Sequence, residues 1–369
     1  MAYSYEKLRA AAMEKGAPRY IYEPIGEQLT PRMDFECLPD YFMPQVDLAN
    51  ARVRRLLSDR KSCEAFVFFA DAHVRQNGMA SVPIIRSILE NTGIETVIYG
   101  GDTVSAWVNE ETALEDVLYF KEAFSFAKPY MVRGNHDIYG KEFGIADRGI
   151  VLPGDKVYDL IFSEGASRVH GEKGKTYYYF DHADTKTRYI VVDTNEQLTP
   201  VWDQDGIWDC SVGVTREQIE WFAAQLRALP AGYAAVVVGH IPFFEQLRWS
   251  NPIAHIFGKL IEAYNKRRMV FGVRGADFRE ARGLVLLTLS GHGHCDDAYV
   301  SPDGCVNLET HCDAMTDNGG SRYKKRRGTV TESVVDVVIL DRKTGDVFTV
   351  RYGAGADRRF LRKGNGNRT

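Results

Sequence analysis

The sequence predicts an α/β protein whose sheets are at least partly parallel, and two patterns lead to this prediction. Short runs of apolar, β-branched and aromatic residues recur along the chain, and they are continuously apolar, as expected of strands buried on both faces. Stretches of helical length lie between several of these runs, and alternation of strand and helix favours parallel pairing. With 369 residues, the chain can form one large domain or two smaller ones.

The predicted elements follow one another in this order. Buried strands are predicted at 65–71, 95–102, 129–136, 188–195, 234–240 and 284–292. Helices are predicted at 47–60, 82–93, 109–124 and 215–229, and the last begins with Thr215 and Gln218 at the spacing of a capping box. Residues 334–353 form two apolar runs around a Thr-Gly-Asp turn, which predicts a β-hairpin.

The chain divides into three predicted parts. Residues 1–60 are expected to be a peripheral helical extension, whose first short helix ends at Gly16. Residues 61–353 form the main domain, with irregular rim insertions around 141–175 and 241–280, and such loops usually determine specificity. Residues 354–369 are polar and basic, and we expect a loose tail there.

Composition narrows the class of protein. The net charge of −4 gives no general sign of nucleic-acid binding. The six cysteines contain no CxxC pair, and the first twenty residues lack the apolar core of a secretory signal. No apolar run is long enough to cross a bilayer. We therefore expect a cytoplasmic protein with reduced thiols and no membrane partner.

Five of the six predicted strands end in side chains of types that bind metals. These side chains are Asp71 and His73, Asp102, Asn135 and His136, His240, and finally His292 and His294. In open α/β sheets the ligand site lies beyond the carboxyl ends of the strands, so residues far apart in sequence can meet at one rim. A lone histidine after a strand is more often packed or surface-exposed, and Gly-Asp is a common turn. Five such motifs in order are hard to explain by chance.

The donor types indicate the kind of metal site. Apart from His136, these side chains make a set of seven candidate ligands: two Asp, one Asn and four His. Seven ligands are too many for a single ion and suit two ions that share a carboxylate. Asp102 is the best bridging candidate because a carboxylate can donate from two oxygens. Mixed nitrogen and oxygen donors favour first-row metals such as Mn, Fe, Zn or Co over Ca.

In order, the motifs DAH, GGD, GNHD, GH and GHGH resemble the signature of the calcineurin-like metallophosphoesterase superfamily, D-x-H, GD, GNH[DE], H and GHxH. The match runs from about 71 to 294. The resemblance implies a four-layer αββα sandwich of two mixed sheets flanked by helices, with the C-terminal hairpin among its later strands. It also implies a dinuclear metal-dependent phosphoester hydrolase, in which a hydroxide shared by the metals attacks phosphorus in line.

The resemblance assigns roles residue by residue. It would place Asp71, His73 and His294 on one metal, Asn135, His240 and His292 on the second, and Asp102 between both. His136 would assist the leaving group and, with Asp102, form the catalytic pair. Asp137 would support the loop or orient His136, and Gly134 would let the chain turn sharply.

Departures from the family pattern exclude two branches. The second motif reads GDTVSAW, so it lacks the GDxVDRG of the protein Ser/Thr phosphatases. Ser105 also stands where purple acid phosphatases carry a tyrosine. We therefore expect the substrate to be a small phosphomonoester or phosphodiester. A nuclease-like phosphodiesterase remains as the alternative, supported by the basic run at 321–329, and a non-catalytic scaffold on the same fold is a third possibility.

Substrate contacts are suggested by position alone. Arg133 could pair with a phosphate oxygen, or form an ion pair at the end of its strand. Tyr139 and Phe243 could line a pocket, or belong to ordinary packing. Asp296 and Asp297 follow the last ligand and could orient His294, or be surface carboxylates. The sequence fixes neither the natural substrate, the metals, nor the oligomeric state.

Overall fold

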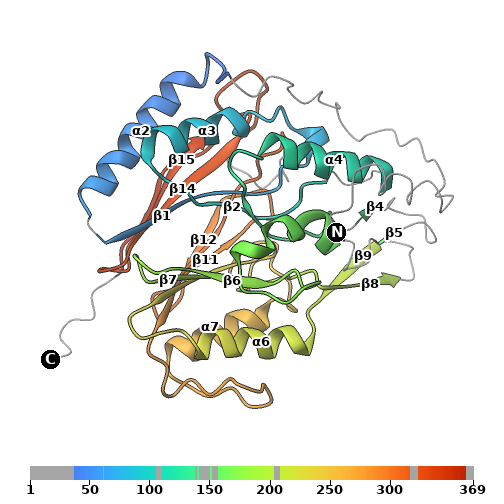
Figure 1. Cartoon of the computed structure of the whole chain (residues 1–369), viewed down its shortest axis with the longest axis vertical. Helices are drawn as coiled ribbons and strands as arrows, with labels where there is room; N and C mark the ends of the chain where they lie inside the picture. The colour runs from blue at the N-terminus through green and yellow to red at the C-terminus, as the bar shows by residue number, and fades with distance from the viewer. Residues whose placement is uncertain are drawn as a thin grey trace.

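Two six-stranded mixed sheets face each other, with helices on their outer sides (Figure 1). The computed structural model describes residues 37–60, 62–104, 110–137, 139–140, 150–151, 157–202, 208–315 and 323–362. The predicted α/β class and the four-layer αββα arrangement are confirmed. All three predicted helices between the buried strands are present, and the hairpin forms as β14 (Val334–Asp341) and β15 (Val347–Gly353).

The first sheet has the order β16-β15-β14-β1-β2-β3. Its strands are β1 (Cys63–Phe69), β2 (Val97–Tyr99), β3 (Tyr130–Met131), β14 (Val334–Asp341), β15 (Val347–Gly353) and β16 (Arg358–Phe360). β1, β2 and β3 are parallel, whereas β14 pairs antiparallel with β1. The C-terminal hairpin therefore completes a sheet that the N-terminal strands begin.

The second sheet has the order β12-β13-β11-β10-β7-β6. Its strands are β6 (Tyr178–His182), β7 (Thr187–Val191), β10 (Ala234–Val238), β11 (Leu284–Ser290), β12 (Asp297–Val300) and β13 (Val306–Glu309). The four central strands are parallel, and β6 and β12 are antiparallel edges. Two small ribbons lie apart from the sheets, β4 (Tyr139–Gly140) with β5 (Ile150–Val151), and β8 (Gln197–Trp202) with β9 (Trp208–Gly213).

Helices cover the outer face of each sheet. The helices on the first sheet are α2 (Met43–Ser58), α3 (Ser81–Thr92) and α4 (Glu110–Ala123), and those on the second are α6 (Arg216–Arg227) and α7 (His255–Asn265). Short turns of helix are η1 (Val74–Gln76), η2 (Tyr158–Phe162) and η3 (Ser163–Arg168). No helix in the described part of the chain is long and apolar enough to span a bilayer.

The continuous apolar strands are explained by two-sided burial. On β1, Phe66 and Phe68 pack between the sheets, while Val67 and Phe69 pack against the helices. Side chains alternate between faces along a strand, so a strand that is covered on both faces must be apolar at every position.

Three sequence-based assignments need adjustment. α2 belongs to the same hydrophobic cluster as β1, so the boundary at residue 60 does not separate this helix from the core. The stretch 241–280 contains α7, a packed helix rather than irregular chain. Part of the expected tail is ordered as β16, which pairs with β15, and an ion pair between Arg358 and Asp336 also ties this segment to the sheet. Residues 1–36, with the first predicted helix, and residues 363–369 lie outside the described residues.

Candidate metal centre

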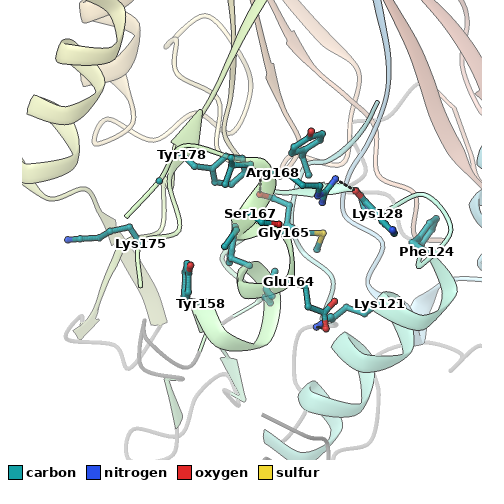
Figure 2. A pocket seen from close by; sticks show the side chains of 18 of the residues that line it. Lys121, Phe124, Lys128, Tyr158, Glu164, Gly165, Ser167, Arg168, Lys175 and Tyr178 are labelled. Carbon is teal, nitrogen blue, oxygen red and sulfur yellow. Dashed lines mark hydrogen bonds and ion pairs between the residues drawn. The ribbon is translucent and has the colours of Figure 1, made fainter. Parts of the chain in front are cut away.

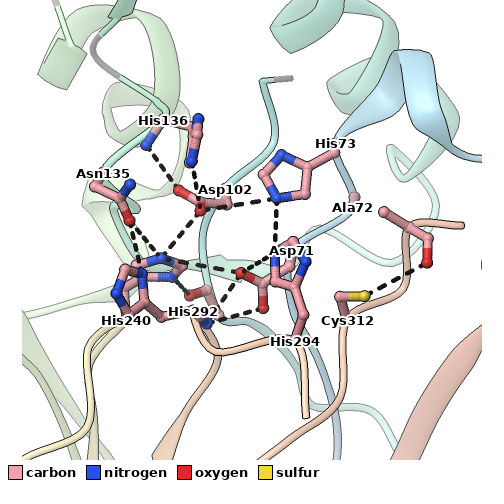
Figure 3. A network of polar contacts seen from close by, with 12 residues as sticks. Asp71, Ala72, His73, Asp102, Asn135, His136, His240, His292, His294 and Cys312 are labelled. Carbon is pink, nitrogen blue, oxygen red and sulfur yellow. Dashed lines mark hydrogen bonds and ion pairs between the residues drawn. The ribbon is translucent and has the colours of Figure 1, made fainter. Parts of the chain in front are cut away.

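The ends of five strands from both sheets meet at one edge of the sandwich, and Figure 3 shows the side chains they carry. The first sheet contributes the residues that follow β1, β2 and β3, and the second contributes those that follow β10 and β11. The structure therefore brings together all seven predicted ligands: six fall into two groups, and Asn135 Oδ1 lies beside two histidines of the second group. Asp71, His73 and His294 form one group of metal-binding side chains, and Asp102, His240 and His292 form the other.

In the first group, two imidazoles face each other. His73 Nε2 lies 3.0 Å from His294 Nε2, and His294 Nε2 lies 3.6 Å from Asp71 Oδ1. His73 Nδ1 donates to the carbonyl oxygen of Val104 at 2.9 Å, which leaves the Nε2 lone pair directed toward the other ligands. This tautomer is the one a metal requires.

The second group has the same construction. His240 Nδ1 donates to the carbonyl oxygen of Gly100 at 2.8 Å, and its Nε2 lies 3.0 Å from Asn135 Oδ1. His292 Nδ1 also lies 3.0 Å from that amide oxygen. Donor atoms that bind one ion at about 2.1 Å stand about 3 Å apart when they are neighbours in its coordination sphere, so this spacing fits a metal.

Asp102 lies between the groups. Its Oδ2 is 3.1 Å from His240 Nε2 and 3.9 Å from His73 Nε2. One carboxylate oxygen thus faces donors of both groups, which is the position that a bridging ligand needs.

Burial and charge set the protonation of these groups. Although burial raises it, the neighbouring histidines hold the pKa of Asp102 well below its usual range. Burial and the positive charge of His294 lower the pKa of His73 to about 3, and burial and His240 do the same for His292. Although burial lowers it, Asp102 raises the pKa of His240 to about 9, and Cys312 and Asp71 likewise hold the pKa of His294 well above its usual range. Since histidines bind metal ions as neutral imidazoles, metal binding at this centre would release protons from His240 and His294.

The profile of the calcineurin-like phosphoesterase family matches residues 65–296, which is more than half of the chain. The chain belongs to this family. Among solved structures, a dimetal phosphatase from Danio rerio is similar with a TM-score of 0.51 and 10% identity, covering 81% of this chain and 99% of that one. This likeness shows the shared fold.

Two further structures align less well. A phosphatase from Mycoplasma pneumoniae has a TM-score of 0.36 and 12% identity, and covers 80% of this chain and 95% of that one. Vacuolar Protein Sorting 29 from Cryptosporidium parvum has a TM-score of 0.33 and 12% identity, and covers 82% of this chain and 100% of that one. No curated protein matches significantly.

In this calcineurin-like chain, most of the predicted ligands have strained backbones. A left-handed φ occurs at Asp71 (55°), His73 (37°), Asp102 (62°), His292 (75°) and His294 (51°). Such a conformation costs roughly 1–3 kcal/mol per residue and persists only where the surroundings impose it. Strain concentrated at these five positions indicates that the loops are shaped for the site rather than for stability.

The glycine of the GNHD motif has a role different from the one we expected. Gly134 does not have a left-handed φ, so a sharp turn is not the reason for it. A Cβ on Gly134 would instead lie 2.0 Å from Asp102 Oδ1 and 2.3 Å from Asp102 N. Only glycine lets the loop after β3 approach the Asp102 carboxylate this closely.

Asp137 joins the two loops around Asp102. Its carboxylate accepts the backbone N–H groups of Asp102 at 3.0 Å, Thr103 at 2.7 Å and Gly134 at 2.8 Å. It does not belong to either group of metal-binding side chains. Of the two roles we considered, loop support is the one this geometry favours.

His136 lies over the centre and is open to solvent. Its backbone N–H donates to Asp102 Oδ1 at 2.8 Å, and its Nε2 lies 3.9 Å from Asp102 Oδ2. The His136 side chain is 27% exposed, against 3% for His73. An imidazole that lies near the Asp102 carboxylate and has access to solvent is free to contact a bound molecule.

The suggested substrate contacts lie elsewhere or are not described. Arg133 is buried and its Nη1 donates to Asp193 Oδ2 at 3.0 Å, which is the ion pair we left open as its alternative. Phe243 is buried and packs edge-on against Phe257. Ser105 and the side chain of Tyr139 lie outside the described residues. We therefore propose no substrate contact for Arg133 or Phe243.

A separate cavity of about 420 Å³ lies beside the end of α4 and the turns η2 and η3 (Figure 2). Tyr130, Tyr158 and Tyr178 are among its lining residues, and none of the seven proposed ligands is. It is thus distinct from the metal centre.

The sequence analysis missed Cys312, which hydrogen-bonds to the imidazole of His294. Although burial raises it, the positive charges of His294 and Lys325 lower the pKa of the Cys312 thiol to about 5. The ammonium group of Lys325 donates to the carbonyl oxygens of Cys312 and Asp313. A single cysteine beyond a short strand offered no pattern from which this contact could be predicted.

Proposed function

We propose that the protein is a dinuclear metal-dependent phosphoester hydrolase. The observation that carries this proposal is the placing of Asp102 Oδ2 between two groups of metal-binding side chains, with the half-buried His136 imidazole beside it. Asp71, His73 and His294 would hold one ion, and Asn135, His240 and His292 the other, with Asp102 shared. Membership of the calcineurin-like phosphoesterase family supports the same reaction class.

A metal pair bound by these residues would supply charge neutralisation for the phosphate and a nucleophile at neutral pH. The protein's own part is to hold the donors and to manage the proton of the leaving group. Asp137 and Gly134 keep the bridging carboxylate in place, and His136, when protonated, donates to the departing oxygen. General acid assistance of this kind is typically worth about 10²–10⁴-fold in rate.

The proposed substrate is a small phosphomonoester or phosphodiester, and the metals are first-row ions such as Mn, Fe, Zn or Co. A nuclease-like phosphodiesterase is the second candidate, because Lys324, Arg326 and Arg327 in the basic run are exposed. The net charge of −4 favours the small substrate. A scaffold without activity is least favoured, since the full ligand set and His136 are retained. We place the protein in the cytoplasm.

Hydrolysis of bis-p-nitrophenyl phosphate and p-nitrophenyl phosphate with added Mn²⁺ tests the proposal. Turnover should depend on the metal, disappear in Asp102→Asn, and fall about 10²–10⁴-fold in His136→Ala. His170 is exposed and lies beside β6, at an edge of the second sheet. His170→Ala is therefore the matched control and should keep the wild-type rate.

Asp102→Asn with unchanged metal content and an unchanged rate would refute the proposed centre. A higher rate on the diester would identify a phosphodiesterase, and a higher rate on the monoester a small-molecule phosphatase. Two bound metals without turnover of either compound would mean that the rim loops select a narrower substrate, and no metal at all would support the scaffold.

A further inference from the structure

Asp296 lies two residues after His294, and its carboxylate turns away from the metal centre toward the C-terminal hairpin. It accepts two hydrogen bonds from Arg351, from Nη2 at 2.7 Å and from Nη1 at 2.9 Å. Arg358 Nη1 lies 3.4 Å from Asp296 Oδ1. The chain that carries two proposed ligands is therefore held by a forked ion pair to another part of the fold.

Arg351 is fully buried and fixed on a second side. Its Nε and Nη2 donate to the carboxylate of Asp336 at 2.8 Å and 2.9 Å, and its Nη1 donates to the carbonyl oxygen of Ala354. Asp336 lies on β14 and Arg351 on β15, where the two residues are paired across the hairpin. The first sheet thus fixes the position of the guanidinium that binds Asp296.

Asp296 also contacts the segment after β13, which in turn contacts the loop that carries Asp71. Its Oδ1 accepts the backbone N–H of His311 at 3.2 Å. Three residues on, the backbone N–H of Ala314 donates to the carbonyl oxygen of Asp71 at 2.9 Å. Asp296 therefore contacts three parts of the fold: the hairpin, the segment that follows β13, and the loop that carries His292 and His294.

We propose that Asp296, held by Arg351, is a positioning residue that sets the place of His292 and His294 in the metal centre. The inference rests on the proposed function, since it assumes that these histidines bind metal. Its basis is the geometry of the contacts: Asp296 is the member of this ion network that belongs to the ligand loop, and Arg351 presents it with a rigid fork. A flexible surface pair could not fix a loop in this way.

Asp336 provides a matched control within the same network. Both carboxylates accept two hydrogen bonds from Arg351 and both lie near Arg358, but Asp336 belongs to β14 and carries no ligand. Replacing either by Asn removes one charge from the same arginine. A merely structural role for Asp296 would make the two variants behave alike.

The experiment measures Mn²⁺ binding to the full chain by titration calorimetry, with metal content checked by elemental analysis, and thermal unfolding in chelator. Asp296→Asn and Asp336→Asn should both unfold at lower temperature. Asp296→Asn should weaken binding of at least one ion by about 10–100-fold, the range found when outer partners of metal ligands are lost. Asp336→Asn should bind both ions with less than a 3-fold change.

Wild-type affinity in Asp296→Asn, or an equal loss in Asp336→Asn, would overturn the inference. If Asp296→Asn does not fold, Arg351→Lys tests the same contact, because it keeps the charge and loses the fork. It should weaken Mn²⁺ binding by several-fold, and unchanged binding would contradict the proposal. A wild-type protein that binds two ions but hydrolyses neither the two nitrophenyl phosphates nor any of a broad panel of other phosphomonoesters and phosphodiesters would refute the proposed function and leave this inference standing.

Discussion

Replacing Asp137 with Asn tests whether the loops around the bridging carboxylate are held by a single side chain. The Asp137 carboxylate accepts three backbone N–H groups, two on Oδ2 and one on Oδ1. An amide has only one acceptor oxygen, so the variant can keep two of these bonds at most. Its NH₂ group would then face the N–H of Thr103, which now lies 2.7 Å from Oδ1.

The magnitude follows from these contacts. A buried N–H without an acceptor costs about 1–3 kcal/mol, and each remaining bond weakens by about 1 kcal/mol once the acceptor is neutral. Burial and the charge of Asp102 raise the pKa of Asp137, so removing the negative charge relieves part of this cost. We expect a net loss of about 2–3 kcal/mol, which corresponds to a fall of about 3–4 °C in the unfolding midpoint of a chain of 369 residues.

The assay combines thermal unfolding in chelator with Mn²⁺ titration. Asp137→Asn should lose stability and also bind Mn²⁺ about 10–100-fold more weakly, because Asp102 and Gly134 are no longer held together. Asp341→Asn is the control, since Asp341 also accepts backbone N–H groups, from Lys343 and Thr344, but at the hairpin turn. Wild-type metal affinity in Asp137→Asn, or an equal loss of affinity in Asp341→Asn, would refute the reasoning.

Three further outcomes are expected. Gly134→Ala should fold but lose most Mn²⁺ binding and turnover, because its Cβ would displace Asp102. Gly232→Ala, at a turn with no atom within 4 Å of the added Cβ, should lose some stability because its φ is 77°, but should change neither metal binding nor turnover. Adding Mn²⁺ at 100 times its dissociation constant should stabilise the wild type by about 2.7 kcal/mol per ion, and a chelator should reverse it; a midpoint that ignores metal would contradict this. Although burial raises it, Arg351 and Arg358 lower the pKa of Asp296, so its carboxylate stabilises the fold above its unfolded pKa of about 3.9 and loses this effect as pH falls through the lower, folded value. The difference in unfolding midpoint between wild type and Asp296→Asn should therefore shrink below about pH 4, and a difference independent of pH would show that the charge is not responsible.

The fold class and the meeting of the seven candidate ligands could be predicted because both depend on local patterns. Runs that are apolar at every position identified the buried strands, and polar residues placed directly after them identified the edge where the strands end. The edge strand β12 and its neighbour β13 escaped notice because each is only four residues long and contains polar side chains among the apolar ones.

The contacts between distant segments could not be predicted. α7 has apolar residues at helical spacing, but Gly258 interrupts the pattern, and the reason for it is the carbonyl oxygen of Phe243, 2.5 Å from where a Cβ would lie. Arg133 lies next to the GNHD motif in sequence, yet its guanidinium reaches Asp193, which follows β7 of the other sheet. Neighbourhood in sequence does not determine the direction in which a long side chain extends.

The strand order of the first sheet has a consequence for how the protein is made. β1 lies in the middle of this sheet, between β2 and β14, but β14 is separated from it by most of the chain. During synthesis, β2 can pair with β1 early, whereas the opposite edge of β1 stays unpaired until residues 334–341 leave the ribosome. An apolar strand with an open edge is a site for pairing with other chains. A nascent chain that stalls before residue 334 would carry every proposed metal ligand and still be prone to aggregate.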